Sequence, residues 1–376
     1  MLTRYTKNHK GKLVKQASVY VKEEHGIALS SLDTEAVAIC RQLIYSGAQA
    51  YIVGGAIRDL LLGREPKDWD IVTNEVPAKI RKIFRRSRII GKRFKLVHVT
   101  SPQGSIFEVA TFRSLDKDEE GILFGTLEED AYRRDFTLNA LYYDVVHEQI
   151  IDFHGGYQHI KQRVIYPVVS LKHTFIEDPV RMIRAIKSAQ TTQSRLSMSL
   201  SRTIKKQVKL LEKSSKSRLG EELLKVLALP EYVDFLQQSY EMGILQYWIP
   251  AYYQYLATFS KKDIQNFWLQ MKQPIVIKQK KFKIISARHK AMYSMFYPYI
   301  SSLGEIRKMD GEYIVKQLKS LLHPIVFPNK DIFYVIKMII AKEGLPASFF
   351  KEQDYLQRKR CRKNALIEDR EALFHE

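Results

Sequence analysis

Two aspartates separated by one residue, Asp68 and Asp70, are the part of this sequence best suited to chemistry. The stretch from Asp68 to Thr73 alternates as a strand does, so both carboxylates are expected on one face of that strand. Two such carboxylates can hold a pair of Mg²⁺ ions about 4 Å apart, one activating an attacking hydroxyl and one stabilising a leaving group. The alternative is an exposed polar strand face with no chemical role.

A pair of glycines strengthens the chemical interpretation. Gly54 and Gly55 follow a short apolar run, and twelve residues separate Gly55 from Asp68. Small glycines let a triphosphate approach the backbone closely, and their amides can bind its oxygens. Glu108, on a separate expected strand, is placed to provide a third carboxylate.

Paired arginines occur further along the chain. Arg133 and Arg134 lie beside several acids and precede an apolar run that contains Asn139. Their forked donors suit phosphate oxygens, and the alternative is a helix surface covered with salt bridges.

A fourth segment, FIEDPVRMIRAIKSA (175–189), combines an acid with spaced arginines. Pro179 in the first helical turn makes Asp178 a natural cap, and Arg181 and Arg184 follow at three-residue steps. An Asp and an Arg in this arrangement could hydrogen-bond the Watson–Crick edge of a base. The alternative is helix capping with an exposed cationic stripe.

The elements expected around these residues are mixed α/β in the N-terminal part and helical beyond about residue 175, where apolar residues recur at helical spacing. The expected helices are 33–46, 56–62 and 77–84, and the expected strands are 51–53, 68–73, 96–100 and 106–112, with a loop at 114–126.

Composition indicates a polyanionic partner. Lys and Arg outnumber Asp and Glu by 61 to 41, which gives a formal charge of +20. Nucleic acid is the leading candidate and an anionic membrane surface the second. Basic clusters that could track phosphates lie at 81–95, 278–290 and 358–363.

Other signals are weak. The sequence has neither an apolar run long enough for a spanning helix nor the apolar core of a signal peptide, so we expect a soluble, cytoplasmic protein. Cys40 and Cys361 have no metal-ligand spacing, and we expect reduced thiols. His98, on an apolar strand, is expected to pack rather than to catalyse.

Taken in order, YIVGGAIRDLLLGREPKDWDIVT, IFEVATFR, EEDAYRRDFTLNALYYD, IIDFHGG and EDPVRMIRA resemble the class II branch of the polymerase-β nucleotidyltransferase superfamily, which contains bacterial poly(A) polymerases and CCA-adding tRNA nucleotidyltransferases. These motifs cover roughly residues 50 to 190, and SRLGEELLKVL with MGILQYWIP resembles the helical region that follows. The resemblance implies an α+β fold, in which a polymerase-β-like nucleotidyltransferase domain with a mixed sheet precedes an all-helical RNA-binding region. The expected divisions are a basic N-terminal arm at 1–30, a catalytic head domain at 31–172, a helical neck at 173–255 for nucleotide recognition and RNA binding, and a basic helical RNA-binding region at 256–376.

The resemblance also assigns roles to single residues. Asp68 and Asp70 would be metal ligands, and Asp135 matches an active-site acid, so Glu108 and Asp135 compete for the third carboxylate role. Nucleotide binding would fall to Gly54, Gly55, Arg58, Arg134, Asn139, Asp178, Arg181 and Arg184. Of these, Asp178 with Arg181 matches the pair that reads the incoming base. Lys187 stands where the family has a further arginine, which keeps the charge but loses the forked geometry.

The expected activity is template-independent addition of AMP from ATP to RNA 3′ ends, with Mg²⁺ as cofactor. The segment IIGKRFKLVHV (89–99) favours a poly(A) polymerase acting on mRNA or small RNA 3′ ends. The alternatives are a CCA-adding or A-adding enzyme acting on tRNA, which would also use CTP, and an inactive RNA-binding homologue. Neither DNA nor a membrane is an expected partner.

Overall fold

The computed structural model describes residues 2–7, 11–91, 96–115, 124–275, 285–352 and 355. These residues form two compact units. The first takes residues up to Arg181 together with Ser188–Ile204, and the second takes Met182–Lys187 and the described residues from Lys205 onward. The chain passes between the units within helices α8 (Arg181–Thr192) and α9 (Met198–Gln207).

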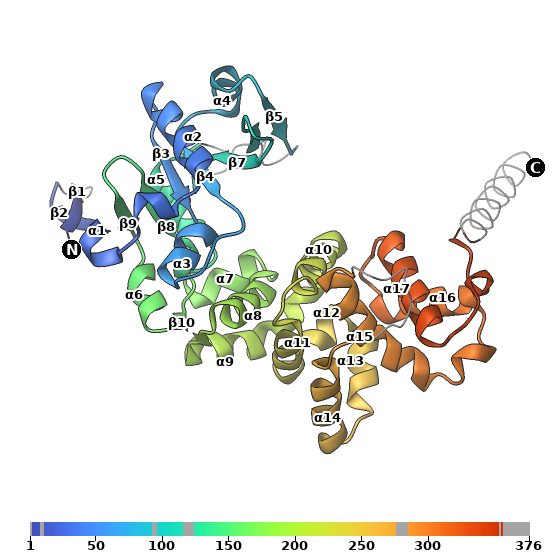
Figure 1. Ribbon diagram of the computed structural model, residues 1–376. Helices are drawn as coiled ribbons and strands as arrows, with labels where there is room; N and C mark the ends of the chain where they lie inside the picture. The colour runs from blue at the N-terminus through green and yellow to red at the C-terminus, as the bar shows by residue number, and fades with distance from the viewer. Residues whose placement is uncertain are drawn as a thin grey trace, which may run out of the picture. The chain divides into compact units, whose positions relative to one another are not determined.

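A nine-stranded sheet is the framework of the first unit (Figure 1), in the order β1-β2-β9-β8-β3-β4-β7-β6-β5. Strands β4 and β7 pair in parallel, and the other neighbours pair antiparallel. The strands are β1 (Leu2–Lys7), β2 (Leu13–Tyr20), β3 (Ala50–Val53), β4 (Asp70–Thr73), β5 (Ser87–Ile90), β6 (Leu96–Thr100), β7 (Ile106–Thr111), β8 (Leu141–Asp144) and β9 (Gln149–Asp152).

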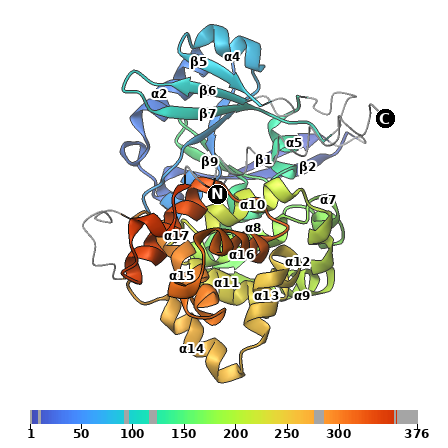
Figure 2. The same ribbon diagram turned by 90° about the vertical axis from the view of Figure 1, so that its right-hand side faces the viewer.

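Helices pack against this sheet. Helix α2 (Thr34–Tyr45) begins after Asp33, whose carboxylate accepts hydrogen bonds from the backbone amides of Glu35 and Ala36, as expected for an N-cap. Figure 2 shows α4 (Pro77–Ile83) beside strands β5 and β6 at one edge of the sheet. Further elements of this unit are α1 (Lys22–His25), α3 (Gly55–Leu61), α5 (Leu127–Tyr132), η2 (Thr137–Asn139), α6 (Gly156–Lys161) and α7 (Leu171–Glu177), with the two-stranded pair β10 (Val164–Ile165) and β11 (Arg195–Leu196).

The core beneath α5 follows from strand alternation. Tyr51 and Val53 of β3 project to the same face of the sheet. There they pack with Tyr142 of β8 and with Leu127 and Ala131 of α5, all buried. Burying each large apolar side chain contributes about 1.5 to 3 kcal/mol. This packing fixes α5 on the sheet, and the two arginines that follow α5 are fixed with it.

The second unit is helical, as the spacing beyond residue 175 predicted. Its core includes Trp248, whose indole nitrogen donates to the carbonyl of Leu219 at 3.2 Å and whose ring meets Phe235 edge to face. The helices are α10 (Lys216–Val226), α11 (Tyr232–Glu241), α12 (Ile244–Trp248), α13 (Pro250–Ala257), α14 (Lys261–Met271), α15 (Ala287–Ser302), α16 (Gly311–Leu322) and α17 (Asn329–Lys342). The mixed sheet and the helical second unit confirm the expected fold class.

The residues that were expected to form a basic N-terminal arm instead begin with two strands. Strands β1 and β2 form an antiparallel hairpin, and β2 continues the sheet by pairing with β9. Two features hid the strand pattern: the register shifts at a bulge between Arg4 and Tyr5, and the outer residues of both strands are exposed on both faces. Alternation is a signal only where one face is buried.

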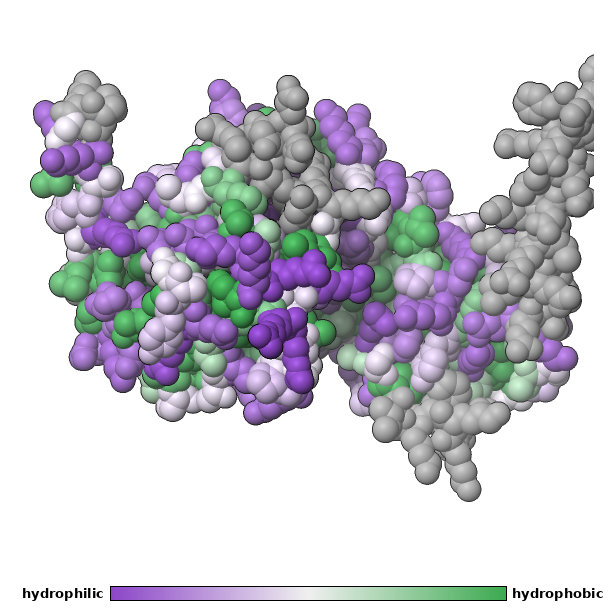
Figure 3. All heavy atoms as spheres, turned by 90° about the horizontal axis from the view of Figure 1, so that it is seen from above, coloured by the Kyte–Doolittle hydropathy of each residue, from purple (hydrophilic) through white to green (hydrophobic). Residues whose placement is uncertain are grey.

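The surface is largely hydrophilic on the face in Figure 3, with apolar side chains in separate patches. Among the residues that the structure describes, no helix combines the length and apolar character needed to cross a bilayer. Cys40 is a buried free thiol, and burial raises its pKa. Cys361 and the basic cluster 358–363 lie outside the described residues, as does part of the cluster 278–290.

Candidate active site

Asp70 is the first residue of β4 and lies opposite Val53, the last residue of β3. The observed strand is therefore shorter than the predicted range 68–73. After Val53 the chain turns at Gly54 into α3, so β3 offers no partner to the residues that precede Asp70. Asp68 lies in the loop before β4 and is exposed.

Gly54 brings the groups around Asp70 close to the backbone. Its φ of +78° is a conformation that residues with a Cβ rarely adopt. A Cβ at this position would lie 3.6 Å from Nη1 of Arg134 and 3.7 Å from Oδ2 of Asp70. The glycine is thus required by its conformation, and an added Cβ would stand in ordinary contact with both charged groups.

Glu108 lies next to Asp70 because β4 and β7 are parallel with Ile71 opposite Val109. The Glu108 side chain is 56% exposed, and its Oε1 is 3.5 Å from Nε2 of His98 on β6. His98 is half-buried and faces this carboxylate, so it is less enclosed than the sequence suggested.

Three charged side chains, those of Arg134, Glu108 and Asp68, act on the carboxyl group of Asp70. Loss of solvent around its carboxyl raises the pKa of Asp70, the guanidinium of Arg134 opposes this change, and the carboxylates of Glu108 and Asp68 add to it. A site with three nearby carboxylates and one compensating arginine is stabilised by an added cation. The electrostatics therefore favour a bound metal ion at this end of β4.

Arg134 is held in place by residues that the sequence analysis did not single out. Its Nη2 donates to Oδ2 of Asp130 at 3.1 Å, and the Tyr142 hydroxyl donates to the same oxygen at 2.9 Å. Burial alone would lower the pKa of Arg134, but Tyr142 and Asp130 raise it, so the guanidinium stays charged. Asp130 is only 6% exposed. The four-residue step from Asp130 to Arg134 within the helical pattern was the available sequence signal.

A second hydrogen-bonded chain joins three of the expected site residues. Arg58 donates through Nη1 to Oδ1 of Asn139 at 2.9 Å, and Asn139 donates through Nδ2 to Oδ1 of Asp135 at 3.0 Å. Asp135 also accepts from the amide of Phe136. Asp135 thus holds Asn139, which in turn accepts from Arg58, and Glu108 is the acid on the strand beside Asp70.

The segment IIDFHGG (150–156) supports η2, the turn that carries Asn139. Asp152 is buried and accepts from the amides of His154, Gly156 and Tyr157, each at 3.0 Å. Gly156 then lies against the turn, and a Cβ there would be 2.1 Å from the carbonyl oxygen of Thr137. This close contact fixes η2, which contains Asn139.

Asp178 and Arg181 make local contacts. The amide of Val180 donates to Oδ1 of Asp178 at 3.2 Å, and α8 begins at Arg181, two residues later than a cap at Asp178 would place it. Arg181 is 9% exposed and donates through Nη1 to the carbonyl of Thr174 and to Oε2 of Glu177. The alternative of an exposed cationic stripe is therefore wrong for Arg181.

Arg184 belongs to the helical unit. Its Nε donates to Oε1 of Glu222 at 3.0 Å, and Nζ of Lys187 donates to Oε2 at 2.7 Å. The Glu222 side chain is 3% exposed. Burial alone would raise the pKa of Glu222, but Lys187 and Arg184 hold it below its ordinary value. Glu222, which the sequence analysis missed, thus pairs with two basic residues of the EDPVRMIRAIK segment.

The residues at the end of β4 suit Mg²⁺. Hard oxygen ligands from one or two carboxylates, completed by substrate phosphates and water, are the set that this ion prefers. Asp70 and Asp68 provide such oxygens, and Glu108 lies beside them. Within the residues that the structure describes, no three acidic, histidine or cysteine side chains form a complete metal-ligand cluster of their own. Substrate oxygens would have to complete the coordination.

Comparison with known proteins finds matches in both the N-terminal and the helical part of the chain. Residues 50–166 match the family described as the poly A polymerase head domain, and residues 196–256 match the probable RNA and SrmB-binding site of polymerase A. Poly(A) polymerase I of Salmonella typhi is 37% identical over 271 residues, which cover 68% of this chain and 58% of that protein. The CCA-adding enzyme of Geobacillus thermodenitrificans is 37% identical over 219 residues, which cover 57% of this chain and 54% of that protein.

Solved structures show the same architecture. The crystal structure of the Bacillus stearothermophilus CCA-adding enzyme in complex with CTP superposes with a TM-score of 0.59 at 26% identity, covering 88% of this chain and 82% of that one. The matches assign residues 50–166 to the poly A polymerase head domain and residues 196–256 to the probable RNA-binding region of that polymerase. The chain belongs to the family that contains poly(A) polymerases and CCA-adding enzymes. It spans less than two thirds of the length of the two curated relatives.

Proposed function

We propose that this protein adds AMP from ATP to the 3′ end of RNA without a template. The observation that carries the proposal is the position of Asp70, between Arg134 at Gly54 and Glu108 on the parallel strand β7. Carboxylates for a metal ion and a guanidinium for a phosphate then face one another at the end of β4. Transfer of a nucleotidyl group needs this combination, because positioning and charge stabilisation supply most of its catalysis.

The proposed reaction is an in-line displacement. The RNA 3′ oxygen forms a bond to the α-phosphorus of ATP, the bond from that phosphorus to the β-phosphate oxygen breaks, and the hydroxyl proton passes to solvent. Mg²⁺ bound at Asp68 and Asp70 would supply Lewis-acid activation of the hydroxyl and charge stabilisation of the departing pyrophosphate. We assign Glu108, rather than Asp135, as the third carboxylate, because Glu108 is the neighbour of Asp70.

The remaining residues bind and orient the nucleotide in this proposal. Arg134 contacts the triphosphate, and the buried Asp130 and Tyr142 keep its guanidinium in one orientation. Arg58, held by Asn139, lies on the helix that follows the Gly54-Gly55 turn and offers a second guanidinium to phosphate or ribose oxygens. Asp178 and Arg181 read the incoming base, which requires Arg181 to exchange its bond to the half-exposed Glu177 for one to the base.

Poly(A) synthesis is the activity that we favour over CCA addition. The poly(A) polymerase I match covers 68% of the chain and the CCA-adding enzyme match 57%, at equal identity. The segment at 89–99 also favours a poly(A) polymerase, although residues 92–95 lie outside the described ranges. CCA addition is the second candidate because the relative solved with CTP covers most of both chains.

An inactive RNA-binding homologue is disfavoured by the acids themselves. A surface used only to bind RNA gains nothing from Asp68, Asp70 and Glu108 together, because carboxylates repel phosphate. Loss of solvent raises the pKa of Asp70, and the carboxylates of Glu108 and Asp68 raise it further. A bound cation would offset the repulsion between these carboxylates.

The deciding experiment measures which nucleotide is added to which RNA. Purified protein is incubated with Mg²⁺ and labelled ATP or CTP, and with either an unstructured oligomer or a tRNA that lacks its CCA end. The proposal predicts repeated AMP addition to the oligomer. Incorporation of CMP into the tRNA would overturn the poly(A) assignment, and no incorporation under any condition would reject the enzymatic proposal.

A further inference from the structure

Helix α16 exposes one row of polar and aromatic side chains. Tyr313, Lys316, Ser320 and His323 are exposed and follow one another at three- or four-residue steps. Side chains at these steps lie on one face of a helix. Because the opposite face of α16 packs into the core of the helical unit, this row is fixed in orientation.

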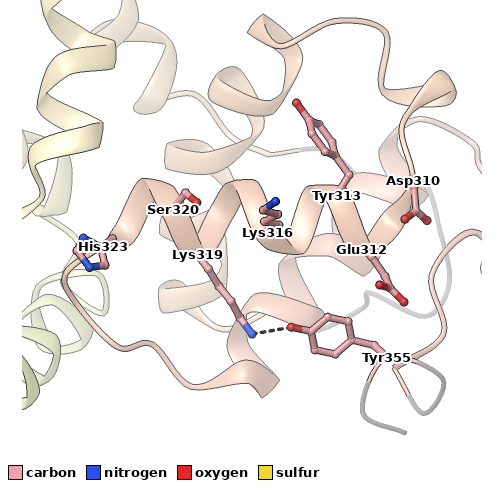
Figure 4. A pocket seen from close by; sticks show the side chains of 8 residues that line it. All are labelled: Asp310, Glu312, Tyr313, Lys316, Lys319, Ser320, His323 and Tyr355. Carbon is pink, nitrogen blue, oxygen red and sulfur yellow. Dashed lines mark hydrogen bonds between the residues drawn. The ribbon is translucent and has the colours of Figure 1, made fainter. Parts of the chain in front are cut away.

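The row forms a wall of an open cavity of about 810 Å³ (Figure 4). Tyr313 and Tyr355 lie on opposite sides of the helix, with Lys316 between them. Lys319 is anchored at the cavity wall: its Nζ donates to the Tyr355 hydroxyl at 2.9 Å and lies 5.1 Å from the centre of that ring. The cavity therefore combines two ammonium groups with two aromatic rings.

Charge is separated along this cavity. Asp310 and Glu312 stand at the beginning of α16, whereas Lys316, Lys319 and His323 follow toward its end. At a rise of 1.5 Å per residue, Glu312 and Lys319 are about 10 Å apart along the helix axis. A ligand that carries an anionic group at one end and hydrogen-bond donors at the other would match this polarity.

We propose that this cavity binds a nucleotide of a single-stranded RNA. Lys316 and Lys319 face the phosphate, the Tyr313 ring stacks on the base, and Asp310 or Glu312 accepts a hydrogen bond from a ribose hydroxyl or a base amine. Cationic side chains beside an aromatic ring are the usual means of binding single strands, because every base offers a face for stacking. The inference rests on the proposed function, which makes RNA the substrate.

Other occupants fit the cavity less well. A membrane has no bases and a duplex keeps its bases stacked inside, so neither would present a base face to the Tyr313 ring. A free nucleotide such as ATP shares the chemistry of an RNA nucleotide. The experiment must therefore separate a free nucleotide from an RNA segment.

Binding of fluorescently labelled oligoadenylate to the full chain tests the inference. Tyr313→Ala should weaken binding roughly 5- to 100-fold, because stacking of one base is lost. Lys316→Gln should lower the slope of log affinity against log salt by about 0.7, the value for one phosphate contact on a single strand. Tyr313→Phe keeps the ring and should bind as the unmodified protein does.

Lys262→Gln is the matched control, because Lys262 is an exposed lysine of α14 and loses the same charge. It should leave both affinity and salt slope unchanged. If Tyr313→Ala and Lys316→Gln also behave as the unmodified protein does, the inference is wrong. Unchanged thermal unfolding of each variant shows that it is folded, so that weaker binding reports on the surface.

Photocrosslinking supplies an independent readout. An oligoadenylate with one photoreactive base should label a peptide within 311–323, and the label should persist in excess ATP. Loss of this label in ATP would mean a site for free nucleotide and would overturn the RNA assignment. Because both measurements need no nucleotide transfer, failure of the proposed enzymatic activity remains a separate result.

Discussion

Glu108 lies beside Asp70 on a parallel strand, whereas Asp135 is hydrogen-bonded to Asn139. The register of β4 and β7 brings Glu108 beside Asp70, whereas Asp135 lies between α5 and η2, outside the strands. Because carboxylates that share a metal site are neighbours, we propose Glu108 as the third carboxylate.

Replacement of Glu108 should therefore impair catalysis more than replacement of Asp135. We expect Glu108→Gln to lower kcat for nucleotide addition roughly a hundredfold, through loss of a carboxylate near the metal ions. Asp135→Asn should cost about tenfold or less, because one hydrogen bond to Asn139 changes. Steady-state incorporation of labelled AMP gives both values, and the reverse order would contradict the assignment.

Asp130 should act through Arg134. Asp130→Asn replaces the charged partner of that guanidinium, so Arg134 loses its fixed orientation. We expect KM for ATP to rise about tenfold, with a smaller effect on kcat. Tyr142→Phe, which removes only the hydroxyl bond to Asp130, should raise KM less. An effect of Asp130→Asn on kcat alone would argue against a role in nucleotide binding.

Gly156 should be essential for the stability of the turn that carries Asn139. A Cβ at this residue would meet the carbonyl of Thr137 at 2.1 Å, so Gly156→Ala must displace backbone. We expect a loss of about 3 kcal/mol in the free energy of unfolding. Gly104→Ala is the control, since Gly104 has φ of +95° with open space around it and should cost about 1 kcal/mol. Equal losses in denaturant unfolding would show that the contact is unimportant.

The ion pairs of Glu222 with Arg184 and Lys187 should stabilise the protein in a pH-dependent way. The pKa of Glu222 is lowered in the folded state from its ordinary value of 4.5, so these ion pairs contribute fully above that pH. The contribution is lost as the pH falls through the lower folded-state value. We expect Glu222→Gln to cost about 2 kcal/mol at neutral pH, with the difference shrinking in acid. The neighbouring exposed Glu221→Gln should show little effect in the same urea unfolding series, and a pH-independent difference would contradict the ion-pair explanation.

Much of the site was predictable from sequence because its parts are local. Gly54 and Asp70 stand at ends or turns of strands that apolar runs mark clearly, Glu108 lies within such a strand, and Asp33 has the expected capping role. Residues at such positions are brought together by strand pairing, which the sequence indicates through alternation.

The missed residues depend on tertiary contacts. Asp130 and Glu222 look like ordinary acids of helical segments. Only folding reveals that Asp130 is buried against the Tyr142 hydroxyl, and that Glu222 is buried against basic groups more than thirty residues away. The N-terminal hairpin was missed because its exposed outer half has no buried face to produce alternation. The start of β4 was placed too early because the end of its partner β3 is set by the turn at Gly54.

Nucleotide addition by a protein that lacks the two aspartates tests the central claim most directly. With Asp68→Asn and Asp70→Asn combined, and folding verified by thermal unfolding, we expect labelled AMP incorporation into an RNA oligomer to fall by about a thousandfold or more. Incorporation at the rate of the unmodified protein would show that these carboxylates do not hold the catalytic metal ions.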